Sequence, residues 1–183
     1  MNLTKNTTKP LSIQLLYSII GVFSCIALPQ VFHLVGLLTG TGTALGIALS
    51  PMHLPVIALG LTVGPIAGAV TGIFAPVLSH AITGMPYFAN LPLMVVELAV
   101  YGAVSGLIKD AKMPTVIKIV VTQIAGRIAY VCMVALAVYL FKSEQLSVSG
   151  SLVSLLGGLP GVILQLASLP IIVTLYDKLS VKD

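Results

Sequence analysis

Between residues 11 and 108 the chain carries a single charged side chain, Glu97. An ordinary soluble domain is charged at about a quarter of its positions, whereas here 8% of residues are charged and 57% are hydrophobic. Such a chain cannot cover its surface with groups that water solvates. The sequence therefore excludes a soluble globular enzyme and a disordered chain, and it predicts an integral membrane protein.

Apolar runs separated by Gly, Pro and short polar segments divide the chain into helices. A transmembrane helix needs roughly 20 residues, so the length suits six spans with their loops. We expect one all-α membrane domain over residues 1–183, a six-transmembrane-helix bundle. The expected helices cover residues 11–28, 53–64, 66–83, 92–109, 115–141 and 151–176.

The segment 29–52 is apolar but interrupted by Pro29 and by four glycines. Both residue types weaken a continuous helix. We therefore expect the first helix to end before Pro29 and residues 29–52 to form a long outer loop, partly helical. The alternative is that the second helix begins near residue 36.

The lysines are distributed unequally between the two sides that this topology defines. With the N-terminus inside, only Lys142 falls on the outer side. Because cytoplasmic segments of membrane proteins are enriched in Lys and Arg, we expect both termini to be cytoplasmic. The basic net charge of +4 is then a signal of orientation, and no nucleic-acid partner is expected. The inner lysines are Lys5, Lys9, Lys109, Lys112, Lys118, Lys178 and Lys182.

Glu97 and Arg127 are the two charged residues that fall well inside expected helices, away from their cytoplasmic ends. A charge at the centre of a bilayer costs at least about 2.5–3.5 kcal/mol, so such residues usually pair and often mark a ligand pathway. A structural ion pair is the alternative interpretation. The three histidines, Tyr87 and Asn90 are expected on the outer side together with Glu97, with His33 in the first outer loop and His53 at the start of the second helix. This grouping predicts an outward-facing pocket for a small polar ligand.

Small residues recur at a four-residue spacing in several expected helices, as in Gly68 and Gly72. This spacing lets helix backbones approach closely, and most such pairs are expected to pack inside the bundle. The first helix is singled out as a docking surface, since Ser18, Gly21 and Cys25 give it unusually small side chains. We expect these three residues to contact the helices of a partner.

The sequence contains no recognisable catalytic set. It has neither an H-E-x-x-H motif nor a nucleophile elbow, and neither cysteine has metal-ligand spacing. A G-x-x-x-x-G-K-[ST] loop is also absent. We therefore expect a non-catalytic chain without a metal or cofactor of its own, and any ATP that drives transport would be hydrolysed by partners.

Residues 49–108 comprise a helix that ends in Gly64-Pro65, a Gly-rich helix, a loop and a further helix. This stretch, with the length and the expected topology, resembles the substrate-binding S components of energy-coupling factor (ECF) vitamin transporters. The resemblance implies a subunit of a prokaryotic plasma membrane that binds a vitamin in an outward pocket. It also implies docking onto a transmembrane coupling protein driven by two ATPases, followed by toppling in the membrane. The helix-1 docking signature of that family, Ala-x-x-x-Ala, has Gly21-x-x-x-Cys25 as its nearest counterpart here.

The pattern is most similar to S components assigned to pantothenate. On this resemblance the pocket would include His53, Tyr87, Asn90, Glu97 and Arg127, with Arg127 bonding the carboxylate of the vitamin. If Glu97 neutralises Arg127, a neutral or cationic ligand such as pyridoxine or hydroxymethylpyrimidine becomes the alternative. Outside the family, the alternatives are a stand-alone proton-coupled secondary transporter, with Glu97 as proton carrier, and a structural subunit of a larger membrane complex.

Overall fold

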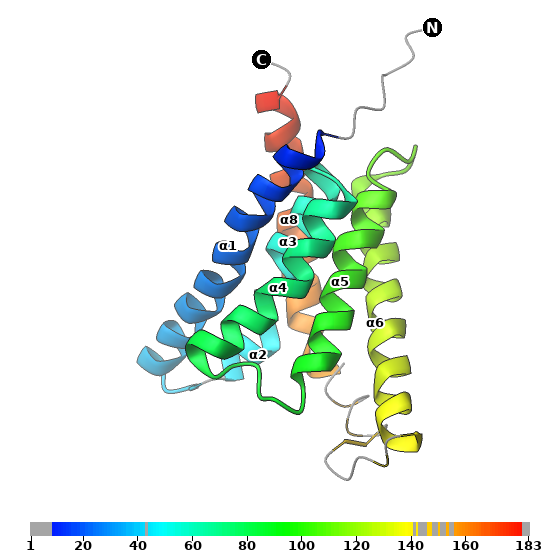
Figure 1. Cartoon of the computed structure of the whole chain (residues 1–183). Coiled ribbons are helices and arrows are strands. Elements are labelled where there is room, and N and C mark those ends of the chain that lie inside the picture. Colours follow the sequence, from blue (N-terminus) through cyan, green and yellow to red (C-terminus); the bar gives the residue numbers. More distant parts are fainter. Residues whose placement is uncertain are drawn as a thin grey trace, which may run out of the picture.

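The described part of the chain, in a computed structural model, folds into helices (Figure 1). The structure describes residues 9–42, 44–140, 142, 146–147, 150, 153 and 156–180, and no strand occurs among them. The all-α fold class is confirmed. The helices are α1 (Leu11–Leu38), α2 (Ala44–Leu49), α3 (His53–Thr62), α4 (Pro65–Thr83), α5 (Leu91–Leu107), α6 (Thr115–Tyr139) and α8 (Leu159–Ser180).

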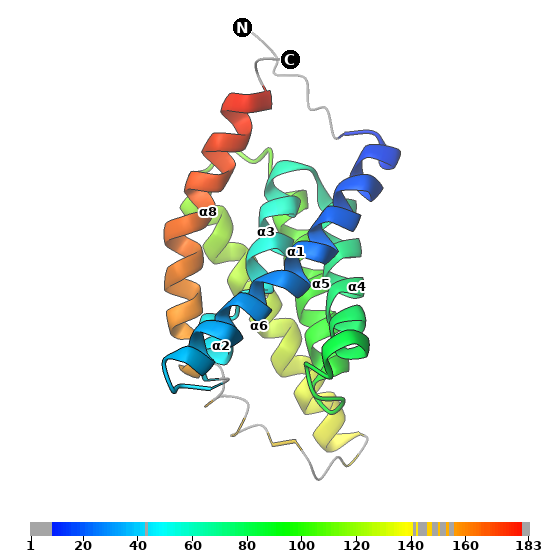
Figure 2. The ribbon, with the colours of Figure 1, turned by 90° about the vertical axis from the view of Figure 1, so that its left-hand side faces the viewer.

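Five helical segments of the described chain are long and apolar enough to cross a membrane. They are α1, the α2–α3 pair taken together over Ala44–Thr62, α4, α6 and α8. α5 is apolar as well but shorter, with 17 residues. These six segments pack side by side, as expected for a helical membrane bundle (Figures 1 and 2).

The prediction that the first helix ends before Pro29 is wrong. α1 continues through Pro29, which is buried within it, to Leu38. A proline removes one helical hydrogen bond, but neighbouring helices make this tolerable in membrane helices. The expected outer loop of residues 29–52 is therefore the end of α1, a turn, and the short helix α2, which leads into α3. The alternative start of the second helix near residue 36 is also wrong, since Gly36 belongs to α1.

The last helix differs from its expected range as well. α8 begins at Leu159 and continues to Ser180 rather than to 176, and Val153, Leu156 and Gly157, which precede it, are helical as well. Several residues of the expected segment 151–158 lie outside the described part of the chain. The shift lengthens the helix at the end that carries Lys178.

One end of the bundle brings together the start of α1, the end of α8 and the loop between α5 and α6 (Figure 1). We call it the lysine-rich end, after its five described lysines, Lys9, Lys109, Lys112, Lys118 and Lys178. The fold thus gathers residues that lie far apart in the sequence at one end. That this end faces the cytoplasm stays a prediction.

The closest helix pair is α4 with α5, and glycines make it possible. A Cβ atom added at Gly102 would lie 2.1 Å from the backbone carbonyl of Gly68, and one at Gly72 would lie 2.3 Å from the carbonyl oxygen of Leu98. Only glycine lets two helix backbones approach so closely. These glycines therefore pack inside the bundle, as the sequence predicts.

Ser18, Gly21 and Cys25, which are expected to contact a partner, are all buried against α3 and α4 within the chain. The Ser18 hydroxyl donates to Gln14 O at 2.9 Å, and Cys25 is fully buried with its thiol 3.4 Å from Met52 O. A Cβ at Gly21 would collide with side chains of α3 and α4. Their small size serves close packing within the chain.

Large apolar side chains form the outward face of α1 instead. Leu16, Ile20 and Phe23 are all exposed, Phe23 to 70%. In a membrane such a face meets lipid tails or another helix.

Candidate functional site

A cavity of about 320 Å³ lies at the end of the bundle opposite the lysine-rich end. Its walls come from the second half of α1, from α2, the start of α3, the end of α4, the loop before α5, the first turns of α5, and α6. All five expected site residues, His53, Tyr87, Asn90, Glu97 and Arg127, line it. We call it the outer cavity. Its volume falls at the lower end of the range for small-molecule sites, about 300–1,000 Å³.

The carboxylate of Glu97 is the best-connected polar group of the outer cavity. Its Oε1 accepts hydrogen bonds from Arg127 Nη1 at 2.9 Å and from the Tyr101 hydroxyl at 3.0 Å. Its Oε2 lies 3.8 Å from His53 Nε2. Charge is tolerated in an apolar interior where it is paired and hydrogen-bonded, and this arrangement meets both conditions.

The two members of the ion pair differ in exposure. The Glu97 side chain is 4% exposed and the Arg127 side chain is 25% exposed. A guanidinium has five N–H donors, so the Nη1 bond to Glu97 leaves most of them available. The charge that a ligand meets in the outer cavity is therefore that of Arg127, with Glu97 behind it.

His53 is held at the first position of α3 with one ring nitrogen turned to the backbone. Its Nδ1 lies 3.1 Å from Ser50 O, and its ring packs edge-on against Tyr101 with centroids 5.3 Å apart. A carbonyl oxygen only accepts hydrogen bonds, so Nδ1 carries the proton. The buried Nε2 has no hydrogen-bond partner within the described protein. This nitrogen is suited to bind a polar group of a ligand.

Tyr87 and Asn90 lie in the loop that precedes α5, at the rim of the outer cavity. Tyr87 is 67% exposed. Asn90 occupies the N-cap position of α5 but makes no side-chain capping bond there. The same loop is tied to α4, where His80 Nδ1 donates to Pro86 O at 2.8 Å. The loop is thus fixed while its polar side chains face the cavity.

Gln30 and His33 also line the outer cavity. Gln30 is not among the expected residues, whereas His33 is expected on the outer side but in a loop. They lie three residues apart on α1 and therefore share one helix face. The His33 ring sits against Gly46 of α2, where an added Cβ would lie 2.6 Å from the ring. The helical spacing would have identified both residues if α1 had been extended beyond Pro29.

The described residues contain no group of three or more His, Cys, Asp or Glu side chains that could hold a metal ion. The polar groups of the outer cavity include an ion pair, two imidazoles, amides, phenols and hydroxyls. Such groups can orient a small polar molecule by hydrogen bonds.

Comparisons of the chain with protein-family models, with curated proteins and with solved structures found no match. The fold therefore defines the chain as an all-helical protein with apolar segments long enough to cross a membrane, and the residues around Glu97 and Arg127 line a cavity between its helices.

Proposed function

We propose that this chain is the vitamin-binding S component of an ECF-type importer and that its ligand is pantothenate. The observation that carries the proposal is the partly exposed guanidinium of Arg127 in a cavity of small-molecule size. The S-component assignment rests on the resemblance over residues 49–108, and the six apolar segments are compatible with it.

The polar groups of the outer cavity support pantothenate as the ligand. Pantothenate has one carboxylate, which matches a guanidinium that retains free donors. Its amide and hydroxyl groups would meet His53 Nε2 and Asn90, which line the same cavity. Glu97 is too buried to repel the carboxylate by direct contact, and it holds Arg127 in place from behind.

The proposed partners supply what this chain lacks. Its sequence has no nucleotide-binding loop, so the importer would need a transmembrane coupling protein and two ATPases. Because Ser18, Gly21 and Cys25 are buried, docking would use other residues. In this proposal the lysine-rich end faces the cytoplasm of a prokaryotic cell and the outer cavity faces away from it.

A neutral or cationic vitamin, pyridoxine or hydroxymethylpyrimidine, is the second candidate. The observation that favours it is the 2.9 Å ion pair between Glu97 and Arg127, which leaves these two residues with no net charge. A ligand that bonds both members would then need no charge of its own.

Ligand-induced stabilisation of the purified chain tests the proposal. A ligand that binds the folded state raises its unfolding temperature by mass action. We expect pantothenate to raise this temperature, Arg127→Gln to abolish the shift, and Lys112→Gln to preserve it. Lys112→Gln is the matched control because it removes one cation at the opposite end of the bundle.

Other results of this experiment would select the second candidate or reject the proposal. A shift with pyridoxine or hydroxymethylpyrimidine alone would select the second candidate. Stabilisation by none of the three vitamins would reject the proposal in both forms. A pantothenate shift that survives in Arg127→Gln would reject the carboxylate contact.

A further inference from the structure

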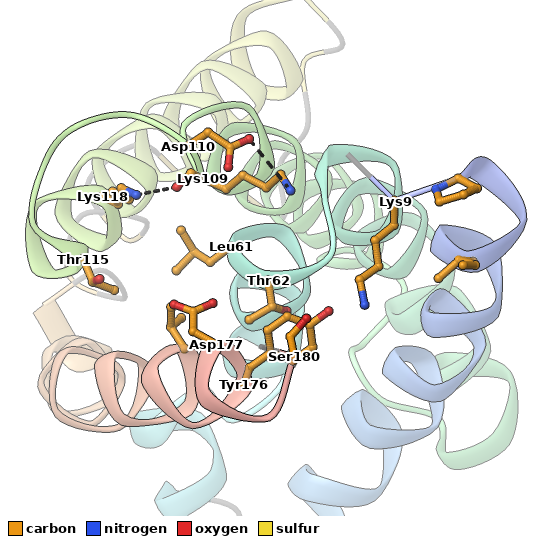
Figure 3. A pocket seen from close by; sticks show the side chains of 13 residues that line it. Lys9, Leu61, Thr62, Lys109, Asp110, Thr115, Lys118, Tyr176, Asp177 and Ser180 are labelled. Atoms are coloured by element: carbon orange, nitrogen blue, oxygen red, sulfur yellow. Dashed lines mark hydrogen bonds and ion pairs between the residues drawn. The ribbon is translucent and has the colours of Figure 1, made fainter. Parts of the chain in front are cut away.

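A second cavity, of about 540 Å³, lies at the lysine-rich end (Figure 3). Its walls come from the start of α1, the end of α3, the α5–α6 loop with the start of α6, and the end of α8. We call it the inner-end cavity. The proposed function does not use it, since the residues of the outer cavity lie at the opposite end of the helices.

Three lysines from different segments line the inner-end cavity: Lys9 before α1, Lys109 after α5, and Lys118 in the first turn of α6. The Lys118 ammonium donates to the carbonyl oxygen of Lys109. Lys109 Nζ lies 3.8 Å from the carboxylate of Asp110, whose side chain is 44% exposed. An ammonium has three N–H donors, so these contacts position both side chains and leave donors for a ligand.

The third lysine, Lys9, lies over two aromatic rings. Lys9 Nζ lies 5.3 Å from the centre of the Tyr17 ring and 5.1 Å from the centre of the Tyr176 ring, a cation–π arrangement. The hydroxyl of Tyr176 is buried and makes no hydrogen bond within the described protein. Tyr176 also lines the cavity, so it adds a hydroxyl donor next to the lysines.

Two helices begin at the inner-end cavity, α1 after Pro10 and α6 at Thr115. Neither has an acidic residue in its first turn or a side-chain capping bond. Their positive dipole ends therefore add to the lysine charge. Asp110 and Asp177 also line the cavity, which leaves it with one more positive than negative side chain.

The position of this cavity favours a lipid over a soluble anion. It lies where several of the apolar helices begin or end, which is the depth of phospholipid headgroups. One part of its wall is apolar, formed by Ile13, Leu61 and Val173. Ile13 is 38% exposed, so the apolar wall continues onto the outer surface of the bundle, where an acyl chain can lie.

We propose that the inner-end cavity binds the phosphate group of an anionic phospholipid such as phosphatidylglycerol. Lys9, Lys109 and Lys118 surround the phosphate, Tyr176 donates a hydrogen bond to it, and the first acyl segment follows Ile13. Free inorganic phosphate offers the same oxygens but has no group for the apolar wall.

The test uses the full-length protein, delipidated in a neutral detergent at physiological salt, which screens loose surface attraction. Its thermal unfolding is followed during titration with phosphatidylglycerol, with phosphatidylcholine of the same acyl chains, and with inorganic phosphate. We expect stabilisation by phosphatidylglycerol alone. The variant K9Q/K118Q should bind it roughly 25-fold more weakly, since a lysine near anionic headgroups contributes about a five-fold factor.

Lys112→Gln is the matched control, because Lys112 lies at the same end but does not line the cavity. It should bind phosphatidylglycerol as the unmodified chain does. If K9Q/K118Q does not fold, Lys9→Gln alone, with an expected loss of about five-fold, replaces it.

Three results would overturn the proposal. Equal stabilisation by phosphatidylcholine would show that the acyl chains bind without the headgroup. Equal stabilisation by inorganic phosphate would assign the site to a soluble anion. An equal loss of affinity in Lys112→Gln would show that the general positive charge of this end, and not the cavity, attracts the lipid.

Discussion

Arg127 of α6 and Glu97 of α5 form an ion pair, with Nη1 and Oε1 2.9 Å apart, in the wall of the outer cavity. The carboxylate is nearly fully buried, whereas a quarter of the arginine side chain is exposed. The pair therefore has two consequences. It joins two helices, and it determines that the charge available to a ligand is positive.

Replacing Glu97 with glutamine tests which member of the pair meets the ligand. Glu97→Gln keeps the size of the side chain and removes the counter-charge of Arg127. We expect pantothenate to bind at least about ten-fold more tightly, since an additional opposite charge nearby lowers the attraction of a guanidinium for an anion. Isothermal titration of the purified variant measures this change. Weaker binding would show instead that Glu97 itself contacts the ligand.

A double-mutant cycle tests the structural side of the pair. Glu97→Gln alone should lower the free energy of unfolding by about 3 kcal/mol, since removing one partner leaves the other charge uncompensated. Arg127→Gln should cost at least about as much, because Glu97 is the more buried partner. The double variant E97Q/R127Q should lose less than the sum of the two. Reversible unfolding in mixed detergent measures all three, and additive losses would show that the two residues do not interact.

His53→Phe tests the imidazole without removing its packing on Tyr101. The variant loses Nε2, which has no hydrogen-bond partner within the described protein. We expect the affinity for the vitamin to fall about ten-fold, the value of one hydrogen bond of roughly 1–1.5 kcal/mol. Calorimetry on the variant and on the unmodified chain gives the ratio. Unchanged affinity would remove His53 from the contact set and leave it a residue that orders the start of α3.

The grouping of the site residues could be predicted from the sequence because the polar residues are so few. Glu97 and Arg127 must find partners in an apolar bundle, and the helix order places His53 at the same end. Tyr87 and Asn90 follow from the turn before α5. Because charged residues are so few in the apolar helices, their positions indicate the site better than any local motif does.

The course of α1 could not be predicted in the same way. Pro29 and the glycines that follow it weaken a helix when the local sequence is considered alone. The helix continues because neighbouring segments bury Pro29 and Gly36. This tertiary effect places Gln30 and His33 on one face of α1 at the outer cavity, and local propensity does not predict that face.

The helices that pack against Ser18, Gly21 and Cys25 could not be predicted from the sequence either. Small side chains predict that another backbone approaches closely, but they do not identify it. In the structure the neighbours are α3 and α4 of the same chain. In this arrangement a partner would contact the exposed side chains of the chain and not these three residues.

Gly102 offers the sharpest test of the packing that supports the site. In Gly102→Ala the new methyl group would lie 2.1 Å from the backbone of Gly68, so α4 and α5 must separate. We expect a loss of about 3 kcal/mol in the free energy of unfolding, at the upper end of overpacking costs.

The matched control is Gly157→Ala, since a Cβ at Gly157 would meet no atom of the described residues within 4 Å. This variant should change stability by less than about 0.5 kcal/mol. Because Gly102 follows Glu97 on the same helix, separation of α5 from α4 should also shift Glu97 relative to Arg127 and weaken vitamin binding. If the two variants unfold alike, α4 and α5 do not pack through their backbones, and the position of Glu97 must be set by α3 and α6 instead.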